Sequence, residues 1–168
     1  MPPSPARITM KIYFAHPCFT DEQREFKNQF MEKISAALTQ NELSNNIIII
    51  DPFEHTPVIE GDIETKMQMA ESVKIECIRL LEECDVIIAL VDNNDTGTAF
   101  EAGYAHAVNK PVILISQEHC SAANAMLIGA AKAIVNNVLE DEQILRLAEL
   151  IKFSCSIWKT SQKKPDDN

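Results

Sequence analysis

The sequence lacks the signatures of several large classes of protein. It contains no GxGxxG, GxxxxGKS or GxxxxGKT segment, which argues against a dinucleotide or nucleoside triphosphate cofactor. No apolar run approaches the length of a membrane-spanning helix, and the N-terminal MPPSPAR lacks the apolar stretch of a signal peptide. The five cysteines form no CxxC pair and no metal-ligand spacing. We therefore expect reduced thiols in a cytoplasmic protein that needs no metal.

Basic residues are also scarce. Lysine and arginine total 15 against 25 acidic residues, for a formal net charge of -10. Binding to nucleic acid or to an anionic membrane surface needs lysine and arginine, so the composition argues against both partners. It does not argue against a nucleoside, which carries no phosphate.

The 168 residues suit one domain with one sizeable core, and no internal repeat divides them. We expect residues 1–9 to be a disordered lead-in, residues 10–160 to form the single domain, and residues 161–168 to be a polar tail.

Strand and helix patterns alternate five times along this domain. Apolar or β-branched segments predict strands at residues 10–15, 47–50, 86–91, 111–116 and 133–138. Helical patterns follow them at residues 20–40, 63–83, 99–108, 122–128 and 139–159. The alternation predicts an α/β fold, a doubly wound five-stranded parallel sheet with helices on both faces, in the flavodoxin-like order 2-1-3-4-5.

The first helix carries clear local signals. Thr20 with Gln23 three residues later matches a capping box at its start. An apolar stripe at a spacing of four then predicts its buried face, formed by Phe26, Phe30, Ile34 and Leu38.

The central strand, residues 86–91, leads into an acidic loop and then a short helix. In open α/β sheets, ligands bind beyond the carboxyl ends of the strands, so Asp92 and Asp95 are candidates to meet a ligand. Glu101 has two interpretations. If Thr98 caps the helix, Thr98 and Glu101 form a capping box; as a carboxylate in the first helical turn, Glu101 could instead attack an anomeric carbon.

Other polar residues fall near the same edge. Asp95 could form an Asx turn or accept hydrogen bonds from sugar hydroxyls, and Asp92 could do the same. Tyr13, near the end of the first strand, could be a core aromatic or could orient Glu101. His16 could contact a base or the 5′ end, or have no catalytic task.

Three segments resemble the nucleoside 2-deoxyribosyltransferase family. They are KIYFAHPCFTDEQ (residues 11–23), DTGTAFEAGYAHAVNKPVIL (residues 95–114) and NAMLIGAAKAIV (residues 124–135). The first is similar to the family's tyrosine-bearing strand and its following loop. The second matches an Asp–x–Gly–x–x–x–Glu–x–Gly block, and the third an Asn–x–Met segment. The likeness runs over about residues 10–138.

The resemblance implies a doubly wound fold and a ping-pong transfer of deoxyribose between nucleobases in nucleotide salvage. Glu101 would be the nucleophile, Tyr13 its orienting partner and Asp95 a ligand of the sugar hydroxyls. Phe19 would line the base pocket. Asn124 would reach the substrate of a neighbouring subunit, which implies a homo-oligomer, a hexamer or a tetramer. No cofactor or metal is implied. The remaining substrate-binding candidates are Asp92, His16 and Gly97.

One position departs from the family's pattern. The family has an aspartate eight residues before the aspartate that leads the central strand. Here that position is Cys77, with Glu76 adjacent as a possible leaving-group acid. One residue is about 100° around a helix, so Glu76 replaces the aspartate only if the helix shifts. Cys77 also falls on an apolar stripe, where core packing explains it. Cys18 stands where the family tends to place an aromatic.

Three other functions stay open at this point. A hydrolase on the same scaffold would cleave a deoxynucleoside or its 5′-monophosphate. The loop after the first strand has no glycine and only Arg24 nearby, which favours a neutral 5′-hydroxyl over a phosphate. A sensor would bind a nucleoside without turnover. A thiol enzyme using Cys18 with His16 lacks an orienting third group.

Overall fold

The structure is a computed structural model that describes residues 9–40 and 47–162. Of the expected lead-in and tail, residues 1–8 and 163–168 lie outside the described residues, whereas residues 161 and 162 form the end of the last helix. The elements, with η for 3₁₀ turns, are β1 (Met10–Ala15), α1 (Asp21–Gln40), β2 (Ile47–Ile50), η2 (Pro52–Glu54), α2 (Ile63–Glu83), β3 (Val86–Leu90), η3 (Asp92–Asn94), α3 (Thr96–Ala107), β4 (Val112–Ile115), η4 (Cys120–Ala122), α4 (Ala125–Ala130), β5 (Ala133–Val135) and α5 (Asp141–Gln162).

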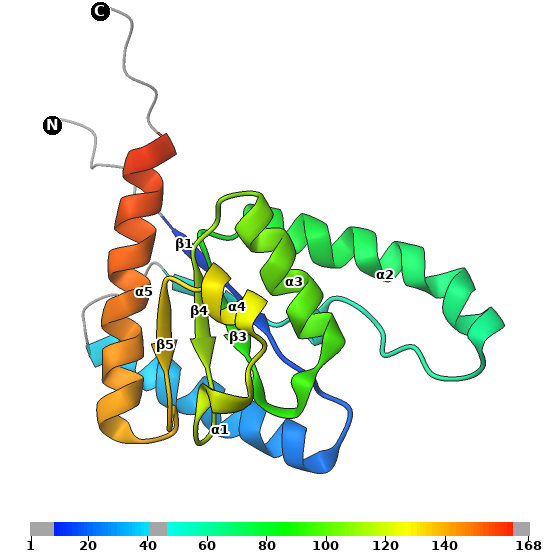
Figure 1. Ribbon diagram of the computed structural model, residues 1–168, viewed down its shortest axis with the longest axis horizontal. Coiled ribbons are helices and arrows are strands. Elements are labelled where there is room, and N and C mark those ends of the chain that lie inside the picture. Colours follow the sequence, from blue (N-terminus) through cyan, green and yellow to red (C-terminus); the bar gives the residue numbers. More distant parts are fainter. Residues whose placement is uncertain (1–8, 41–46, 163–168) are drawn as a thin grey trace, which may run out of the picture.

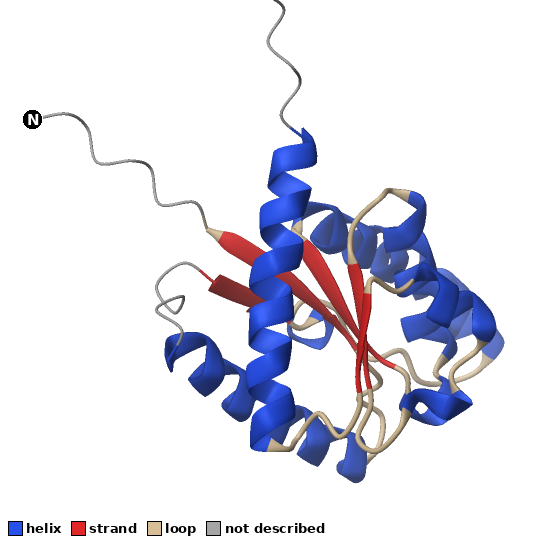
Figure 2. Ribbon diagram, turned by 60° about the vertical axis from the view of Figure 1, so that its left-hand side comes forward, coloured by secondary structure: helices blue, strands red, loops and turns tan. Residues whose placement is uncertain are grey.

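The five strands form one parallel sheet in the order β2-β1-β3-β4-β5. This confirms the predicted doubly wound order. Helices α1 and α5 cover one face, and α2, α3 and α4 lie on the other (Figures 1 and 2). The chain enters the sheet in the middle and winds outward in both directions, so the carboxyl ends of β1 and β3 lie side by side where the order reverses. Ligands bind at this point in folds of this kind.

Side chains of β1 alternate between the two faces of the sheet. Ile12 and Phe14 pack with α1 and α5, whereas Tyr13 and Ala15 pack beneath α2 and α3. This period of two is what turns Tyr13 toward α3. Phe30 is fully buried on the opposite face, and burying a side chain of this size contributes about 1.5–3 kcal/mol.

The capping box at the start of α1 is confirmed. Gln23 N donates to Thr20 Oγ1 at 3.2 Å, and the Gln23 side chain accepts from Thr20 N at 3.1 Å. The four predicted stripe residues of α1 are all buried. Helix α2 differs because most of its length is exposed, and only its last turns are buried beside the sheet, through Leu80 and Leu81. In Figure 1 its N-terminal half extends away from the strands.

Some boundaries differ from those predicted. Strand β5 has three residues instead of six, and α4 begins at Ala125, after the turn η4. Helix α3 begins at Thr96, three residues before the predicted start, which changes the position of Glu101 within it.

Candidate active site

Glu101 and Tyr13 meet between α3 and the sheet. Tyr13 Oη donates a hydrogen bond of 2.6 Å to Glu101 Oε1. The tyrosine is completely buried. Burial and the adjacent Glu101 both raise the pKa of Tyr13, so the phenol keeps its proton and remains a donor. A short bond from a buried donor fixes where the carboxylate points.

Burial also raises the pKa of Glu101, to about 7. The hydrogen bond from Tyr13 lowers this pKa, and the nearby Asp95 raises it. The carboxyl group therefore changes charge within the neutral range rather than near its ordinary 4.5. A buried carboxyl with such a pKa beside a cavity is typical of catalytic acids, bases and nucleophiles.

Cys77 reaches the same two groups from α2. Its thiol lies beside Tyr13, Glu101 and Thr56, close enough to affect their electrostatics. Burial raises the pKa of Cys77, and the charge of Glu101 raises it further, so the thiol stays protonated. The apolar-stripe interpretation of Cys77 is incomplete, because the side chain lies at the boundary between the core and the carboxylate.

The start of α3 corrects one expectation. The N-cap is Asp95, whose Oδ2 accepts from Thr98 N at 2.7 Å, and Thr98 lies inside the helix. Glu101 is therefore in the second turn and makes no capping box. Asn93 and Asn94 precede the cap and have φ angles of 66° and 49°, in the left-handed region that asparagine tolerates. These two residues bend the chain so that Asp95 can cap.

A pocket of about 360 Å³ opens in front of Glu101. The residues that line this Glu101 pocket come from four parts of the chain: the loop after β1 (His16, Phe19), the segment after β2 (Pro52, Phe53, Thr56, Pro57, Val58, Ile59), α2 (Val73, Cys77) and the start of α3 (Asp95, Thr96, Gly97, Thr98, Glu101).

The Glu101 pocket brings together six of the predicted site residues. Phe19 is 56% exposed at the pocket and makes an edge contact with Phe53, with ring centroids 5.7 Å apart. Gly97 sits against the cap, because a Cβ there would lie 3.2 Å from Asp95 Oδ2. The other four are Glu101, Tyr13, Asp95 and His16, of which Tyr13 reaches the pocket only through Glu101.

His16 lines the pocket, yet its ring is buried and both ring nitrogens are engaged. Nδ1 lies 3.0 Å from Pro17 O, and Nε2 lies 3.1 Å from Asp51 Oδ1. Neither nitrogen is available to a base or to a 5′-hydroxyl in this arrangement. The ring supports the wall of the pocket.

Three predicted candidates lie outside the Glu101 pocket. Asp92 Oδ2 accepts from Gln117 N at 2.9 Å and so ties the loop after β3 to the loop after β4. Arg79 Nη2 lies 2.6 Å from Glu76 Oε1, and the hydrogen bonds from Arg79 lower the pKa of Glu76. A carboxyl group kept ionised in this way is a poor proton donor, and Glu76 does not reach the pocket.

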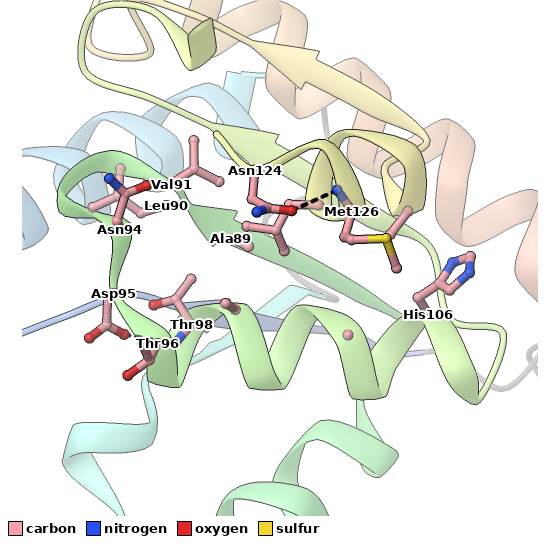
Figure 3. Close-up of a pocket in the computed structure, with 14 residues that line it drawn as sticks. Ala89, Leu90, Val91, Asn94, Asp95, Thr96, Thr98, His106, Asn124 and Met126 are labelled. Atoms are coloured by element: carbon pink, nitrogen blue, oxygen red, sulfur yellow. Dashed lines mark hydrogen bonds between the residues drawn. The ribbon is translucent and has the colours of Figure 1, made fainter. Parts of the chain in front are cut away.

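Asn124, the third, faces a second pocket of about 540 Å³ between α3 and α4 (Figure 3). Its side-chain oxygen accepts from Met126 N at 2.8 Å and so caps α4. Figure 3 shows Thr98 on α3 and Asn124 before α4 on two sides of this space. Met126 beside it is 81% exposed. Asn124 therefore lies on the other side of the start of α3 from Glu101 of its own chain.

The segment after β2 was missed by sequence reasoning, which gave no role to the residues between the strand at 47–50 and the helix at 63–83. Its Phe53 and Thr56 form part of the pocket wall. The available signal was their position just beyond the carboxyl end of a strand, since that edge of the sheet collects ligand-binding residues. The thiol hypothesis finds no support, because Cys18 is buried and burial raises its pKa.

Within residues 9–40 and 47–162, no helix is both long and apolar enough to cross a bilayer. Over the same residues, no group of three or more histidine, cysteine or acidic side chains is arranged to hold a metal ion.

The fold and the site together define a class of protein. A buried carboxylate held by a tyrosine, beside a pocket with two aromatic walls at the switch point of a doubly wound sheet, suits nucleophilic chemistry on a small planar ligand. The model of the nucleoside 2-deoxyribosyltransferase family matches residues 12–144. The chain belongs to this family, whose members are enzymes that act on nucleosides and nucleobases.

Solved structures share the fold. A 2-deoxyribosyltransferase from the psychrotolerant bacterium Bacillus psychrosaccharolyticus is 23% identical, with 80% of this chain and 90% of that chain covered and a TM-score of 0.58. A conserved protein from Enterococcus faecalis is 21% identical, with 86% and 98% covered and a TM-score of 0.59. A CMP N-glycosidase from Clostridium botulinum is 16% identical, with 83% and 98% covered and a TM-score of 0.54. No curated protein matches the chain at a significant level.

Proposed function

We propose that this protein transfers a 2-deoxyribosyl group between nucleobases, with Glu101 as the nucleophile. A carboxylate oxygen of Glu101 attacks C1′ of a 2′-deoxynucleoside. The C1′–N bond breaks, and the base leaves with the bonding electrons and takes up a proton from water. A nitrogen of a second base then attacks C1′ of the covalent intermediate, the bond from C1′ to Glu101 breaks, and the attacking nitrogen loses its proton to water. Two inversions at C1′ retain its configuration.

The observation that carries this proposal is the 2.6 Å hydrogen bond from Tyr13 to Glu101 at the wall of the pocket. The bond leaves the second carboxylate oxygen of Glu101 to face a substrate. Deoxyribose has no electron-withdrawing 2′-hydroxyl, so its oxocarbenium-like transition state is reached more easily than that of ribose. One well-placed carboxylate can therefore supply much of the stabilisation.

Other pocket residues have roles in the same proposal. Asp95 uses Oδ2 to cap α3, and its other oxygen accepts a hydrogen bond from a sugar hydroxyl. Phe19 and Phe53 contact the faces or edges of the base, since aromatic side chains pair well with planar rings. Gly97 leaves room beside Asp95, where a Cβ would be close to the carboxylate.

The 5′ end of the substrate is a neutral hydroxyl in this proposal. Arg24 is the arginine nearest the loop, and it is already engaged by Asp21 and by the carbonyl oxygens of Cys18 and Phe19. A monophosphate needs a free cation, which Arg24 does not supply. Asn124 of a neighbouring copy of the chain contacts this hydroxyl, so the active form is a homo-oligomer. We expect it to act in the cytoplasm.

The test measures transfer directly. The protein is incubated with 2′-deoxyinosine and free adenine, and the nucleosides are separated by chromatography. We expect 2′-deoxyadenosine to form with the wild type and its rate to fall at least about 1000-fold in Glu101→Ala. The matched control is Glu149→Ala, which changes an exposed glutamate of α5 and should leave the rate unchanged.

A covalent intermediate makes a second, sharper prediction. With deoxyinosine alone, quenching in acid should trap the enzyme with one added deoxyribosyl group, detectable by mass spectrometry on the peptide that contains Glu101. Transfer without this adduct would contradict the nucleophile role.

Hydrolysis is the second candidate, because the pKa of Glu101 also suits a general base. A carboxylate with a pKa of about 7 is a good general base for water at neutral pH. Free hypoxanthine and deoxyribose without a new nucleoside would make this enzyme a hydrolase. Binding of deoxyinosine without any product, and with Glu101→Gln binding it equally well, would identify a sensor instead.

A further inference from the structure

A buried carboxylate lies behind the wall of the Glu101 pocket. Asp51 follows β2 directly and is only 1% exposed. Its Oδ1 accepts hydrogen bonds from Phe53 N at 3.0 Å and from His16 Nε2 at 3.1 Å. Its Oδ2 lies 3.1 Å from Lys27 Nζ of α1, and the positive charge of this lysine balances the charge of the carboxylate. Asp51 therefore joins three separate segments of the chain.

The charge state of this group follows from its contacts. Burial acts to raise the pKa of Asp51, but hydrogen bonds from His16 and the charge of His16 outweigh it, so the pKa is lowered and the carboxylate is ionised. Both nitrogens of the His16 ring face acceptors, Pro17 O and Asp51 Oδ1. Lys27 adds a positive charge from α1.

Aromatic rings enclose the histidine. The His16 ring stacks on Phe14, with centroids 4.2 Å apart and planes 22° apart, and lies 5.3 Å from the ring of Phe53. Phe53 in turn makes the edge contact with Phe19 at the pocket. A continuous line of rings thus runs from the core of the sheet to the place where a base would bind.

Asp51 also sets the path of the chain into the pocket. It is the N-cap of η2, and Thr56 closes the same turn by donating from its backbone and its hydroxyl to Pro52 O, both at 2.9 Å. Phe53 and Thr56 line the pocket together with Cys77 and Glu101. A shift of Asp51 would therefore move the wall next to the reacting carboxylate.

We propose that Asp51, His16 and Lys27 form a buried clamp that positions the Phe53–Thr56 wall of the Glu101 pocket and thereby determines which nucleobases the pocket accepts. The clamp is a positioning device, since none of its three side chains needs to touch the substrate. The statement about nucleobases rests on the proposed function, whereas the statement about the wall does not.

The energetics give the clamp a distinctive signature. Removing one member of a buried hydrogen-bonded pair leaves the other polar group without its partner, which is destabilising. Removing both members together and filling the space with apolar groups is much better tolerated. Lys27 can follow the change, because its side chain is 21% exposed and can turn toward water. His16→Ala and Asp51→Val should therefore each be worse than the double variant.

The experiment compares the wild type with His16→Ala, Asp51→Val and the double variant. Asp141→Val serves as the matched control. Asp141 lies on α5 and makes an exposed ion pair of 2.6 Å with Lys33, and neither residue lines the Glu101 pocket. The first readout is hydrogen exchange of the backbone amides of His55 and Thr56, which donate to Pro52 O rather than to Asp51. The second readout is KM and kcat for 2′-deoxycytidine and 2′-deoxyinosine as donors.

We expect each single variant to speed exchange at both amides by about tenfold. In the double variant, the increase in the logarithm of the exchange rate should be at most half as large. KM should rise by about tenfold in the single variants, with kcat changing less than about threefold, and the preference between the pyrimidine and the purine donor should shift. Asp141→Val should change none of these quantities.

Each contrary result bears on a different part of the proposal. Unchanged exchange at His55 and Thr56 in both single variants would overturn the clamp, whatever the activity. A double variant as impaired as the two single variants combined would show that His16 and Asp51 act independently. Equal changes for both donors would refute a role in base selection. Exchange that changes as expected in a protein that acts on no nucleoside would support the clamp and refute the proposed function.

Discussion

Ionisation of Glu101 should destabilise the fold, and one substitution should remove this effect. Burial raises the pKa of Glu101 from its ordinary 4.5 to about 7. One pKa unit corresponds to about 1.36 kcal/mol, so ionising this group costs the folded state up to about 3 kcal/mol relative to the unfolded chain. The pKa of Glu101 is higher in the folded state than in the unfolded chain. The contribution of the protonated group to the free energy of unfolding is therefore complete below pH 4.5 and is lost as the pH rises through about 7.

The perturbation is Glu101→Gln. Glutamine has nearly the same size and still accepts a hydrogen bond from Tyr13, but it cannot ionise. At about pH 4 we expect the variant and the wild type to differ in free energy of unfolding by less than about 0.5 kcal/mol. At about pH 8.5 the variant should be more stable by up to about 3 kcal/mol.

The assay is urea unfolding followed by circular dichroism at both pH values, with Glu149→Gln as the exposed control on α5. The control should show no pH-dependent difference from the wild type. A difference for Glu101→Gln that is the same at both pH values, or a variant less stable at high pH, would refute the claim that burial of Glu101 sets its pKa.

Three other substitutions test separate parts of the site and the core. Tyr13→Phe removes a hydrogen bond that lowers the pKa of Glu101, so the acidic limb of kcat/KM against pH should move upward from about 7 by about one pKa unit; an unmoved limb would mean that another group controls it. Cys77→Asp adds a proton donor beside Glu101, so at about pH 6 the rate with donors whose base leaves poorly should rise at least about tenfold relative to donors whose base leaves well, and a constant ratio would exclude a role in protonation. Phe30→Ala should reduce the free energy of unfolding by about 3–5 kcal/mol in urea titrations, whereas Phe153→Ala at an exposed position should change it by less than about 0.5 kcal/mol.

The topology and part of the site could be predicted because they depend on local periodicity. The period of two along β1 places Tyr13 on the opposite face from Phe14, and the regular alternation of strands and helices fixes a parallel sheet. The capping box of Thr20 and Gln23 needs only residues three apart. The position of Tyr13 near the end of the first strand left two roles open, and the resemblance to a family favoured the pairing with Glu101, since no local pattern connects residues so distant in sequence.

The start of α3 could not be predicted because two caps compete at the same spacing. Asp95 and Thr98 are both good N-cap residues, and each has a suitable partner three positions later. The choice depends on the backbone of Asn93 and Asn94, whose left-handed angles leave Asp95 at the point where the helix begins. Whether two adjacent asparagines both adopt such angles is decided by the tertiary fit of the whole loop.

The link between His16 and Asp51 was missed for a different reason. The two residues are 35 positions apart in loops after neighbouring strands. From the sequence, His16 could contact the ligand or have no catalytic task, and no local pattern pointed to Asp51. Only the register of β1 with β2, in which Tyr13 pairs with Ile50, brings the two following loops close enough for this hydrogen bond.

The raised pKa of Glu101 is consistent with its proposed role as a nucleophile, because a site that solvates its carboxylate poorly gains most when positive charge develops nearby. In the free protein, Tyr13 offers one hydrogen bond against the cost of burial. A sugar that begins to carry oxocarbenium character at C1′ supplies the missing positive charge. The interaction is then stronger in the transition state than in the ground state, which is the condition for raising kcat. A second strong hydrogen bond to Glu101 would stabilise the carboxylate before the reaction and reduce that difference. A site that holds Glu101 mainly through Tyr13 therefore favours the transition state.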